Sequence, residues 1–529
     1  MIKKDNNQID EFNGNRFSTK KICLFLASIL VGSFIIRIYF VNFEIPLTND
    51  ALNYFFYALD IKINNQLPVN YSLANPGWGI FLSTFFSIFE SQNVIDYMNL
   101  QKILSISISS LTVLPTYFLC KKFFKKSYCL IGALIIGFEP HLIQNSLFGI
   151  SDSLYIFLIV ISFLLYFNEN KKITYISFVM VGFCTIVRSE GIFVLMTFLI
   201  MIILRRDKNE RKILDVLISV LIFSAVFLPM ALIQIEISGS DMAFGRAINS
   251  IETHVIDPKK STDITGIDFI FNGIQNFPKY LGWNLIPIFL PFVPIGFILM
   301  FKNWNYKIKT VFTGLVLMSM PAFYAYAISI QDGRYFFFLY PLFVILSMIT
   351  IEKIGKKFNK KIVFIAIITF VISSSSVYSI LKVDNNQSDE YLIIAQKISE
   401  SPKTINNYKN SEYLEPLNYP KEFNEFKKFY DLDRIDKKTI RFSVTQQISI
   451  ITMLNHQEIH DFIALNKNSL THIIAENDIE SKFYDVFLNE KKYPYLEKEF
   501  DSPDNSKYQV KIFKINYDKF NCITKEICS

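Results

Sequence analysis

Long apolar runs dominate the first 383 residues and leave few folds open. Runs of about twenty residues, the length that an α-helix needs to cross a bilayer, recur along this part of the chain. The chain is 51% hydrophobic and 16% aromatic, which suits a protein that lies largely in lipid. We therefore predict a polytopic α-helical membrane protein. Its spans, about eleven in number, lie near residues 22–42, 102–120, 127–147, 152–167, 173–187, 191–204, 213–235, 283–301, 309–329, 335–351 and 361–382.

The basic residues predict which ends of these spans face the cytoplasm, because short loops rich in Lys and Arg stay on that side. All such loops fall on one side only if the short run 77–89 does not cross the bilayer. We therefore predict a cytoplasmic segment at 1–21, a first outer loop at 43–100, and a juxtamembrane helix at the outer interface over 77–89. The basic loops are KKFFKK (121–126), NENKK (168–172), RRDKNERK (205–212), KNWNYKIK (302–309) and EKIGKKFNKK (352–361).

Residues 384–529 are polar and follow the transmembrane domain, which we place at 22–383. The segments 470–476 and 508–517 are rich in β-branched and aromatic residues, as strands are. The segment SDEYLIIAQKISE begins with a serine cap and has helical spacing, with Tyr391, Ile394, Ala395 and Ile398 on one face. We predict a small extracytoplasmic α/β domain here.

The cysteines show no metal-binding spacing. Cys522 and Cys528 are the last pair, and an outside location of the C-terminus would favour a disulfide between them. The sequence requires no cofactor and leaves a divalent metal ion open.

Asp50, beside Asn49, lies just after the first span in the stretch PLTNDALNYFFYALD. Aromatic residues follow it at helical spacing, which predicts a helix lying in the interface with its aromatic rings at headgroup level. Taken locally, the simplest role of Asp50 or Thr48 is to cap this helix. A lone carboxylate beside a membrane span is also a candidate for chemistry.

Three further polar clusters stand at the predicted outer ends of spans. They hold Glu139, His141 and Asp152 in FEPHLIQNSLFGISD, Arg188 and Glu190 in VRSEGIF, and Arg334 and Tyr335 in QDGRYFFFLYPLF. Structural alternatives exist for each cluster. Ser151 is placed to cap a helix that begins at Asp152, His141 suits a hydrogen-bonded filler, and Arg188 and Glu190 are close enough in sequence to pair.

The outer position of the arginines favours a functional interpretation. A charge near the membrane is unfavourable unless it faces a cavity or a partner. Guanidinium groups bind phosphate through parallel charge-assisted hydrogen bonds. One carboxylate with two arginines therefore suits an enzyme that holds a lipid-linked phosphate and deprotonates an acceptor hydroxyl. A further arginine, Arg37, lies toward the outer end of the first span, where we expect it to snorkel to the surface.

The order of these motifs resembles the GT-C superfamily of integral-membrane glycosyltransferases, which includes protein O-mannosyltransferases and lipid A aminoarabinose transferases. The resemblance covers roughly residues 20–385. It rests on TND, ANPGWGIF, LCKKFFKK, EPHLIQNSLFGISDSLYIFL, VRSEG and GRYFFFLYPLF, in that order.

The resemblance implies transfer of a sugar from a polyprenyl-phosphate donor outside the plasma membrane, usually with inversion. It implies Asp50 as the catalytic residue, acting as general base. Arg188 and Arg334, with Tyr335, would lie at the donor phosphate. Supporting roles would fall to Asn49, Glu139, His141, Asp152 and Glu190.

Two departures leave parts of this site open. Similar enzymes often have two adjacent acids where this chain has Asn49-Asp50, and often a lysine near the proline where it has Asn75-Pro76-Gly77. The number of acids and the third phosphate ligand are therefore undetermined from the sequence.

Alternative functions remain. Oligosaccharide transfer to asparagine is the nearest, but its WWD-type motif is missing, because Trp78, Trp283 and Trp304 are far apart. A transporter would place polar residues at mid-bilayer, and a receptor that binds a ligand through 384–529 stays open. The net charge of +7 follows from the basic loops, so we expect no nucleic acid partner. The expected partners are a lipid-linked sugar donor, a glycan, lipid or protein acceptor, and membrane lipids.

Overall fold

The computed structural model of the protein describes residues 11–12, 15–16, 19–68, 73, 75–205, 212–238, 266–382, 385–399, 403–405, 417, 419–428, 449–451, 458–467, 470–479 and 481–524. The chain divides into two compact units. The membrane unit comprises Met1–Val41, Tyr54–Ile88 and Leu100–Val383, and the second unit comprises Asn42–Asn53, Phe89–Asn99 and Asp384–Ser529.

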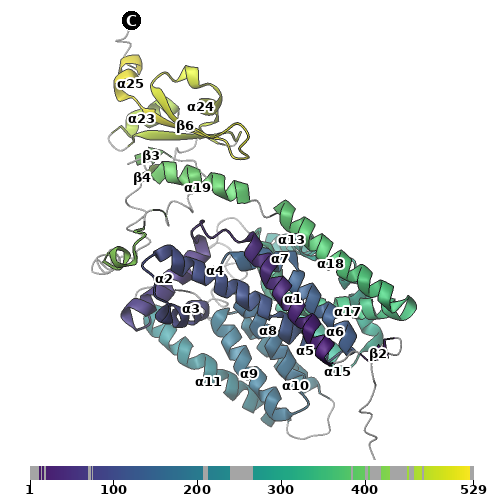
Figure 1. Ribbon diagram of the computed structural model, residues 1–529. Helices are drawn as coiled ribbons and strands as arrows, with labels where there is room; N and C mark the ends of the chain where they lie inside the picture. The colour runs from purple at the N-terminus through teal and green to yellow at the C-terminus, as the bar shows by residue number, and fades with distance from the viewer. Residues whose placement is uncertain are drawn as a thin grey trace, which may run out of the picture. The chain divides into compact units, whose positions relative to one another are not determined.

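Helices build the membrane unit, and each apolar run predicted to span contains a helix or a helix pair (Figure 1). The helices are α1 (Thr19–Phe40), α2 (Asn49–Asn64), α3 (Gly77–Ile88), α4 (Val94–Leu111), α5 (Val113–Cys120), α6 (Lys126–Phe138), α7 (Pro140–Leu147), α8 (Asp152–Tyr166), α9 (Lys171–Val187), α10 (Gly191–Leu204), α11 (Lys212–Ser238), α13 (Gly266–Leu285), α14 (Val293–Met300), α15 (Tyr306–Met318), α16 (Met320–Ala327), α17 (Tyr340–Lys357) and α18 (Lys360–Lys382). Two 3₁₀ segments, η3 (Phe301–Asn303) and η4 (Gly333–Leu339), connect them, and β1 (Glu11–Phe12) pairs with β2 (Asn15–Arg16).

Length and hydropathy confirm a polytopic membrane protein. Among the described residues, six helical segments are long and apolar enough to cross a membrane, and the pair α6–α7, bent by 43°, makes a seventh. The six are Thr19–Phe40, Val94–Cys120, Lys212–Ile237, Tyr306–Ala327, Gly333–Lys357 and Lys360–Lys382. Helices α3, α8 and α10 are apolar but shorter. The number of crossings, about eleven, and the side that each loop faces stay predictions.

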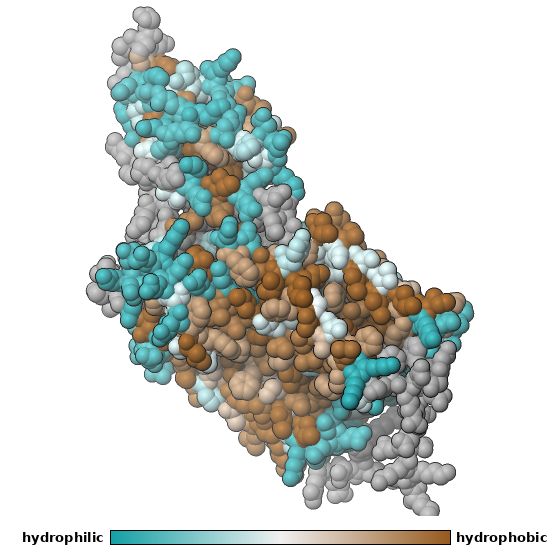
Figure 2. Space-filling model, in the orientation of Figure 1, coloured by the Kyte–Doolittle hydropathy of each residue, from teal (hydrophilic) through white to brown (hydrophobic). Residues whose placement is uncertain are grey.

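The helices differ in how much apolar surface they bury inside the unit. The segment containing α17 is central: 83% of its apolar stretch of 18 residues is buried inside the unit. For α1 the buried share of the corresponding stretch is 22%. Exposed apolar side chains such as Leu24, Leu221 and Ile365 project from α1, α11 and α18. Figure 2 shows this apolar surface, in brown, over helices of the membrane unit. A surface of this kind is stable only against lipid or another apolar partner.

Helix α2 is more deeply buried than the sequence predicts. We expected its aromatic side chains at headgroup level, yet Phe55 and Tyr57 are buried in the membrane unit. Phe55 meets Phe86 of α3 edge-on, with ring centroids 5.8 Å apart. The expectation that these rings face lipid headgroups is wrong, because α3 packs on α2 and the glycine at position 79 lets the Tyr57 ring come close to the α3 backbone. The depth of α2 in the membrane stays a prediction.

Arg37 is also placed differently from the prediction. It does not snorkel; its side chain is fully buried. One terminal nitrogen, Nη1, donates to the carbonyl oxygen of Gly137 at 2.7 Å and to that of Ser33 at 2.9 Å. Within the described part of the chain, Nε and Nη2 have no hydrogen-bond partner. The buried guanidinium therefore ties α1 to the end of α6.

The second unit contains a five-stranded sheet of order β4-β3-β5-β7-β6. The strands are β3 (Lys403–Ile405), β4 (Ser449–Ile451), β5 (His472–Glu476), β6 (Leu496–Asp501) and β7 (Val510–Ile515). Strand β3 pairs in parallel with β4 and β5, and β7 pairs antiparallel with β5 and β6. The predicted strands correspond to β5 and β7, and both are confirmed.

Helices cover this sheet. They include α19 (Asn385–Ser399), α23 (Ile459–Leu465), α24 (Tyr484–Leu488) and α25 (Tyr517–Thr524). The predicted apolar face of α19 is confirmed, because Ile394, Ala395 and Ile398 are buried in one cluster with β5 and β7, and Tyr391 packs at its edge. A small C-terminal α/β fold is therefore present. Its location outside the membrane stays a prediction.

Candidate active site

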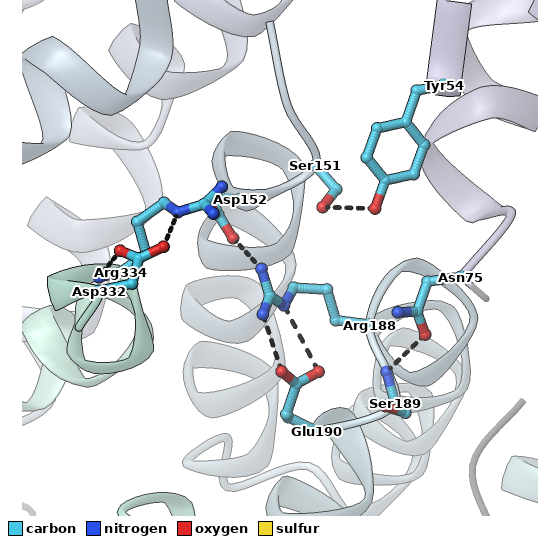
Figure 3. Close-up of polar contacts among 9 residues, drawn as sticks. All are labelled: Tyr54, Asn75, Ser151, Asp152, Arg188, Ser189, Glu190, Asp332 and Arg334. Carbon is cyan, nitrogen blue, oxygen red and sulfur yellow. Dashed lines mark hydrogen bonds and ion pairs between the residues drawn. The ribbon is translucent and has the colours of Figure 1, made fainter. Parts of the chain in front are cut away.

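Two carboxylates hold Arg188 at the turn between α9 and α10. Nη2 of Arg188 lies 2.8 Å from Oε1 of Glu190, and Nη1 forms a short ion pair with Oδ1 of Asp152 (Figure 3). The guanidinium also lies over the Tyr155 ring, 5.9 Å from its centroid. Burial acts to lower the pKa of Arg188, but Glu190 and Asp152 outweigh it and raise the pKa above its ordinary value. Arg188 is therefore a permanently charged member of a partly buried triad.

The start of α3 positions this turn. The side-chain oxygen of Asn75 accepts a hydrogen bond from the backbone N–H of Ser189 at 3.1 Å. Gly77 begins α3 against the end of α9, and a Cβ there would lie only 2.8 Å from the backbone of Ile186 and Val187. Asn75-Pro76-Gly77 thus fixes the turn that carries Arg188.

Arg334 is held differently. Its Nε lies 2.6 Å from Oδ2 of Asp332, whose other carboxylate oxygen accepts from the Arg334 N–H and so caps η4. The Arg334 side chain is 36% exposed, against 19% for Arg188. Tyr335 is half-buried and interacts electrostatically with both arginines as well as with Glu190 and Asp332. The structure therefore brings the Arg188 and Arg334 clusters within electrostatic reach of one tyrosine.

The charges of the two arginines are balanced unequally. Arg188 faces two carboxylates, so its triad carries a net negative charge, whereas Arg334 and Asp332 form a neutral pair. The side chains of Arg334 and Asp332 are 36% and 29% exposed, against 19% for Arg188 and 5% for Asp152, so an incoming phosphate reaches Arg334 more readily. Of the two arginines, Arg334 is the one better placed to accept a new anion.

Asp152 begins α8, as predicted, but Ser151 does not cap it. Ser151 occupies the N-cap position without a side-chain cap bond, and its hydroxyl oxygen lies 3.3 Å from the Tyr54 hydroxyl of α2. The second carboxylate oxygen of Asp152, Oδ2, is buried and has no hydrogen-bond partner among the described residues. This oxygen remains an unused acceptor in the site.

Glu139 and His141 form a separate network. Glu139 is fully buried at the α6–α7 bend, where Oε2 accepts from the Leu142 N–H at 2.9 Å and caps α7. Its Oε1 lies 2.9 Å from Nδ1 of His141, and Nε2 of His141 lies 3.0 Å from the Tyr378 hydroxyl. These contacts link α7 to α18. They give both residues a structural role in addition to the supporting roles that the resemblance implies.

Asp50 lies in the first turn of α2 and is exposed, as is Asn49. Asn49 has a φ of 48°, in the left-handed region that asparagine tolerates better than most residues. The Ala51 N–H donates to the Thr48 carbonyl oxygen at 3.1 Å, which starts the helix. Both Asn49 and Asp50 belong to the second unit, whereas Arg188 and Arg334 belong to the membrane unit.

Three residues of this site were not found from the sequence. Asp332 pairs with Arg334, Asn75 fixes the Arg188 turn, and Tyr155 lies under the guanidinium. Asp332 left a signal because it stands two residues before Arg334, and Asn75 left one because it precedes the Pro76-Gly77 pair already noted in the sequence. Among the described residues, no cluster of three or more His, Cys, Asp or Glu side chains could hold a metal ion. Cys522 is disulfide-bonded, but Cys528 lies outside the described residues, so the predicted pairing stays a prediction.

Comparison with solved structures identifies the fold. The structure of ArnT from Cupriavidus metallidurans bound to undecaprenyl phosphate has a TM-score of 0.52 at 11% identity, over 94% of this chain and 98% of that one. The Archaeoglobus fulgidus oligosaccharyltransferase tethered with an acceptor peptide has a TM-score of 0.52 at 11% identity, over 92% and 73% of the two chains. The same oligosaccharyltransferase in its apo form has a TM-score of 0.51 at 11% identity, over 93% and 74%. The protein therefore has the fold of the GT-C glycosyltransferases.

A sequence family matches as well. Residues 100–415, more than half of the chain, match the family of predicted membrane proteins DUF2079, and the protein belongs to that family. No curated protein sequence matches the chain.

Proposed function

We propose that the protein is a glycosyltransferase that moves a sugar from a polyprenyl-phosphate donor to an acceptor hydroxyl at the outer face of the plasma membrane. The observation that carries the proposal is the shared fold, which covers nearly all of both chains in the comparison with the structure bound to undecaprenyl phosphate. The paired arginine clusters at Tyr335 supply a chemically suitable place for the phosphate of such a donor.

Arg334 and Tyr335 are assigned to the donor phosphate. A guanidinium provides a planar fork of donors that matches two phosphate oxygens. In the absence of donor, Asp332 orients the Arg334 guanidinium through their ion pair. Arg188 adds positive charge from the neighbouring triad, but Asp152 and Glu190 already occupy its donors on two sides.

Asp50 is assigned as general base. The bond between the sugar anomeric carbon and the phosphate oxygen breaks, and a new bond forms between that carbon and the acceptor oxygen. The acceptor hydroxyl proton passes to the Asp50 carboxylate, and polyprenyl phosphate leaves with the electron pair. Arginine stabilises the charge that develops on this phosphate. The exposure of Asp50 leaves it accessible to an acceptor from solution.

The proposal is tested with the purified full-length protein in liposomes. Undecaprenyl-phosphate sugars are supplied with peptide, glycan or lipid acceptors, and released undecaprenyl phosphate is measured. We expect release that depends on one acceptor class, and loss of release in Asp50→Asn. If the protein binds the donor but consumes it with none of these acceptors, the result would instead support a receptor.

Transfer of an oligosaccharide to asparagine is the second candidate. It is favoured by the similarity to the oligosaccharyltransferase, which has the same TM-score. A sequon peptide given with an oligosaccharide donor separates the two, because a monosaccharide transferase leaves that peptide unmodified.

A further inference from the structure

A polar pocket lies among the loops that carry the basic runs. Its volume is about 430 Å³. The turn after α5, the end of α14, the start of α15 and the later part of α17 form its walls, and all belong to the membrane unit. Arg188 and Arg334 are not among its lining residues, so it is distinct from the candidate active site.

Two lysines from different loops line this pocket. Lys122 follows α5 and Lys307 lies in the first turn of α15, and both are half-buried. Nζ of Lys307 donates to the carbonyl oxygen of Lys122 at 2.8 Å, which fixes the two residues side by side. A lysine ammonium has three donors, so Lys307 keeps two for a ligand. Within the described part of the chain, the Lys122 ammonium has no carboxylate partner.

The negative charges near the lysines are fewer than the positive ones. Glu352 lines the pocket, but it forms an ion pair of 3.3 Å with Lys356 one turn along α17. Glu169 interacts electrostatically with Lys307 from the loop before α9. The pocket therefore keeps a surplus of positive charge that an anion would neutralise.

Apart from Asn305 and Tyr306, the remaining lining residues are apolar, which narrows the class of anion that fits. Phe123, Phe124 and Leu299 line the pocket beside the lysines. Close by along the chain, Phe301 stacks on Trp304 with centroids 5.1 Å apart, and both side chains are exposed. Exposed aromatic residues of this kind gather at the level of lipid headgroups. We propose that this pocket binds the phosphate of an anionic phospholipid, with Lys122 and Lys307 on the phosphate oxygens and the phenylalanines against the glycerol and acyl region.

Native mass spectrometry tests the proposal on the full-length protein. The protein is reconstituted with equal amounts of phosphatidylglycerol and phosphatidylcholine, and the lipid that remains bound is counted. Each lysine near anionic lipid adds about a fivefold preference, so we expect the double variant Lys122→Gln/Lys307→Gln to lose about twenty-fivefold in phosphatidylglycerol retention. A Lys122→Arg/Lys307→Arg variant keeps both charges and should retain the lipid.

The matched control is Lys125→Gln/Lys302→Gln, which removes one exposed lysine from each of the same two loops without touching the pocket lining. This control variant should keep the preference for phosphatidylglycerol.

Thermal melting with inorganic phosphate alone separates binding of a lipid headgroup from binding of free phosphate. Stabilisation that disappears in Lys122→Gln/Lys307→Gln would show that free phosphate also binds the site. Equal phosphatidylglycerol retention in all variants, or equal losses in the pocket and control variants, would overturn the proposal whether or not sugar transfer is confirmed.

Discussion

At the scale of single residues, the two arginines of the candidate active site have different surroundings and should respond differently to mutation. Arg188 is enclosed by two carboxylates and an aromatic ring, whereas Arg334 pairs with Asp332 and is more exposed. The sequence placed both residues correctly at turns between apolar helices. It could not rank them, because the burial of Asp152 and the presence of Tyr155 depend on helix packing.

Arg334→Ala should weaken donor binding with little change in stability. Loss of charge-assisted hydrogen bonds to phosphate predicts a decrease of about ten- to a hundredfold in affinity for undecaprenyl phosphate. Arg334→Lys should restore only part of this affinity, because an ammonium lacks the planar fork of donors that a guanidinium has. Thermal shifts with undecaprenyl phosphate, and with undecaprenol as the phosphate-free control, measure this. An unchanged shift in Arg334→Ala would remove Arg334 from the donor site.

Arg188→Ala should act mainly on folding. It leaves Asp152 and Glu190 without their cation, and breaking a buried ion pair from one side costs about 3–5 kcal/mol. We expect a clear fall in melting temperature before any ligand is added. A variant that melts like wild type but fails to bind donor would assign Arg188 directly to the phosphate.

Asp50→Asn separates catalysis from helix capping. Asparagine caps a helix as well as aspartate does, but it cannot take the proton of an acceptor. If Asp50 is the base, the variant folds and binds donor, yet turnover falls by about a hundred- to ten-thousandfold. Turnover is measured beside the melting temperature, with Asp50→Ala in parallel. Near-normal turnover of a stable Asp50→Asn variant would leave Asp50 with a structural role in the first turn of α2.

At the scale of elements, the close approach of α3 to α9 is the contact that the sequence could not reveal. The apolar run of α3 was visible, but a pattern of hydrophobic residues does not say whether lipid or protein covers it. The same limit explains the error over α2, whose aromatic residues pack inside the unit. Helix positions, by contrast, followed well from the apolar runs, because span length and polar breaks are local properties.

Gly77→Ala tests that contact. The added Cβ would meet the α9 backbone at 2.8 Å, and backbone cannot rotate away as a side chain can. Overpacking of this kind typically costs about 1–3 kcal/mol. Gly282→Ala in α13 is the matched control, since nothing lies within 4 Å of a Cβ there. The melting temperature should fall for position 77 and stay or rise for position 282. Equal effects would indicate that α3 adjusts freely.

At the scale of the whole molecule, the orientation in the membrane carries the largest consequences. The helical fold and the small α/β fold follow from composition and periodicity. The number of crossings does not, because several apolar helices are shorter than a full span. Only the distribution of basic loops assigns the sides, and a single extra crossing at 77–89 would invert every later loop.

Cysteine labelling decides this point. In a chain with Cys23, the exposed free cysteine among the described residues, replaced by serine, we expect Lys125→Cys to react with a membrane-impermeant maleimide only after the membrane is opened. Glu44→Cys should react from outside. Labelling of Lys125→Cys in intact cells would place α3 across the bilayer and move the pocket at Lys122 to the other face.

The burial of Arg37 also bears on how the protein is made. The carbonyl of Gly137 that receives the guanidinium lies 100 residues further along the chain. At about 5–20 residues per second, ribosomes reach that residue some seconds after Arg37. During this interval Arg37 lies in the last turn of α1 without its partner from α6, at a cost below the roughly 2.5–3.5 kcal/mol that an arginine costs at a helix centre. The apolar residues of α1 must outweigh that cost, so α1 enters the bilayer first and acquires its buried contact only when α6 assembles beside it.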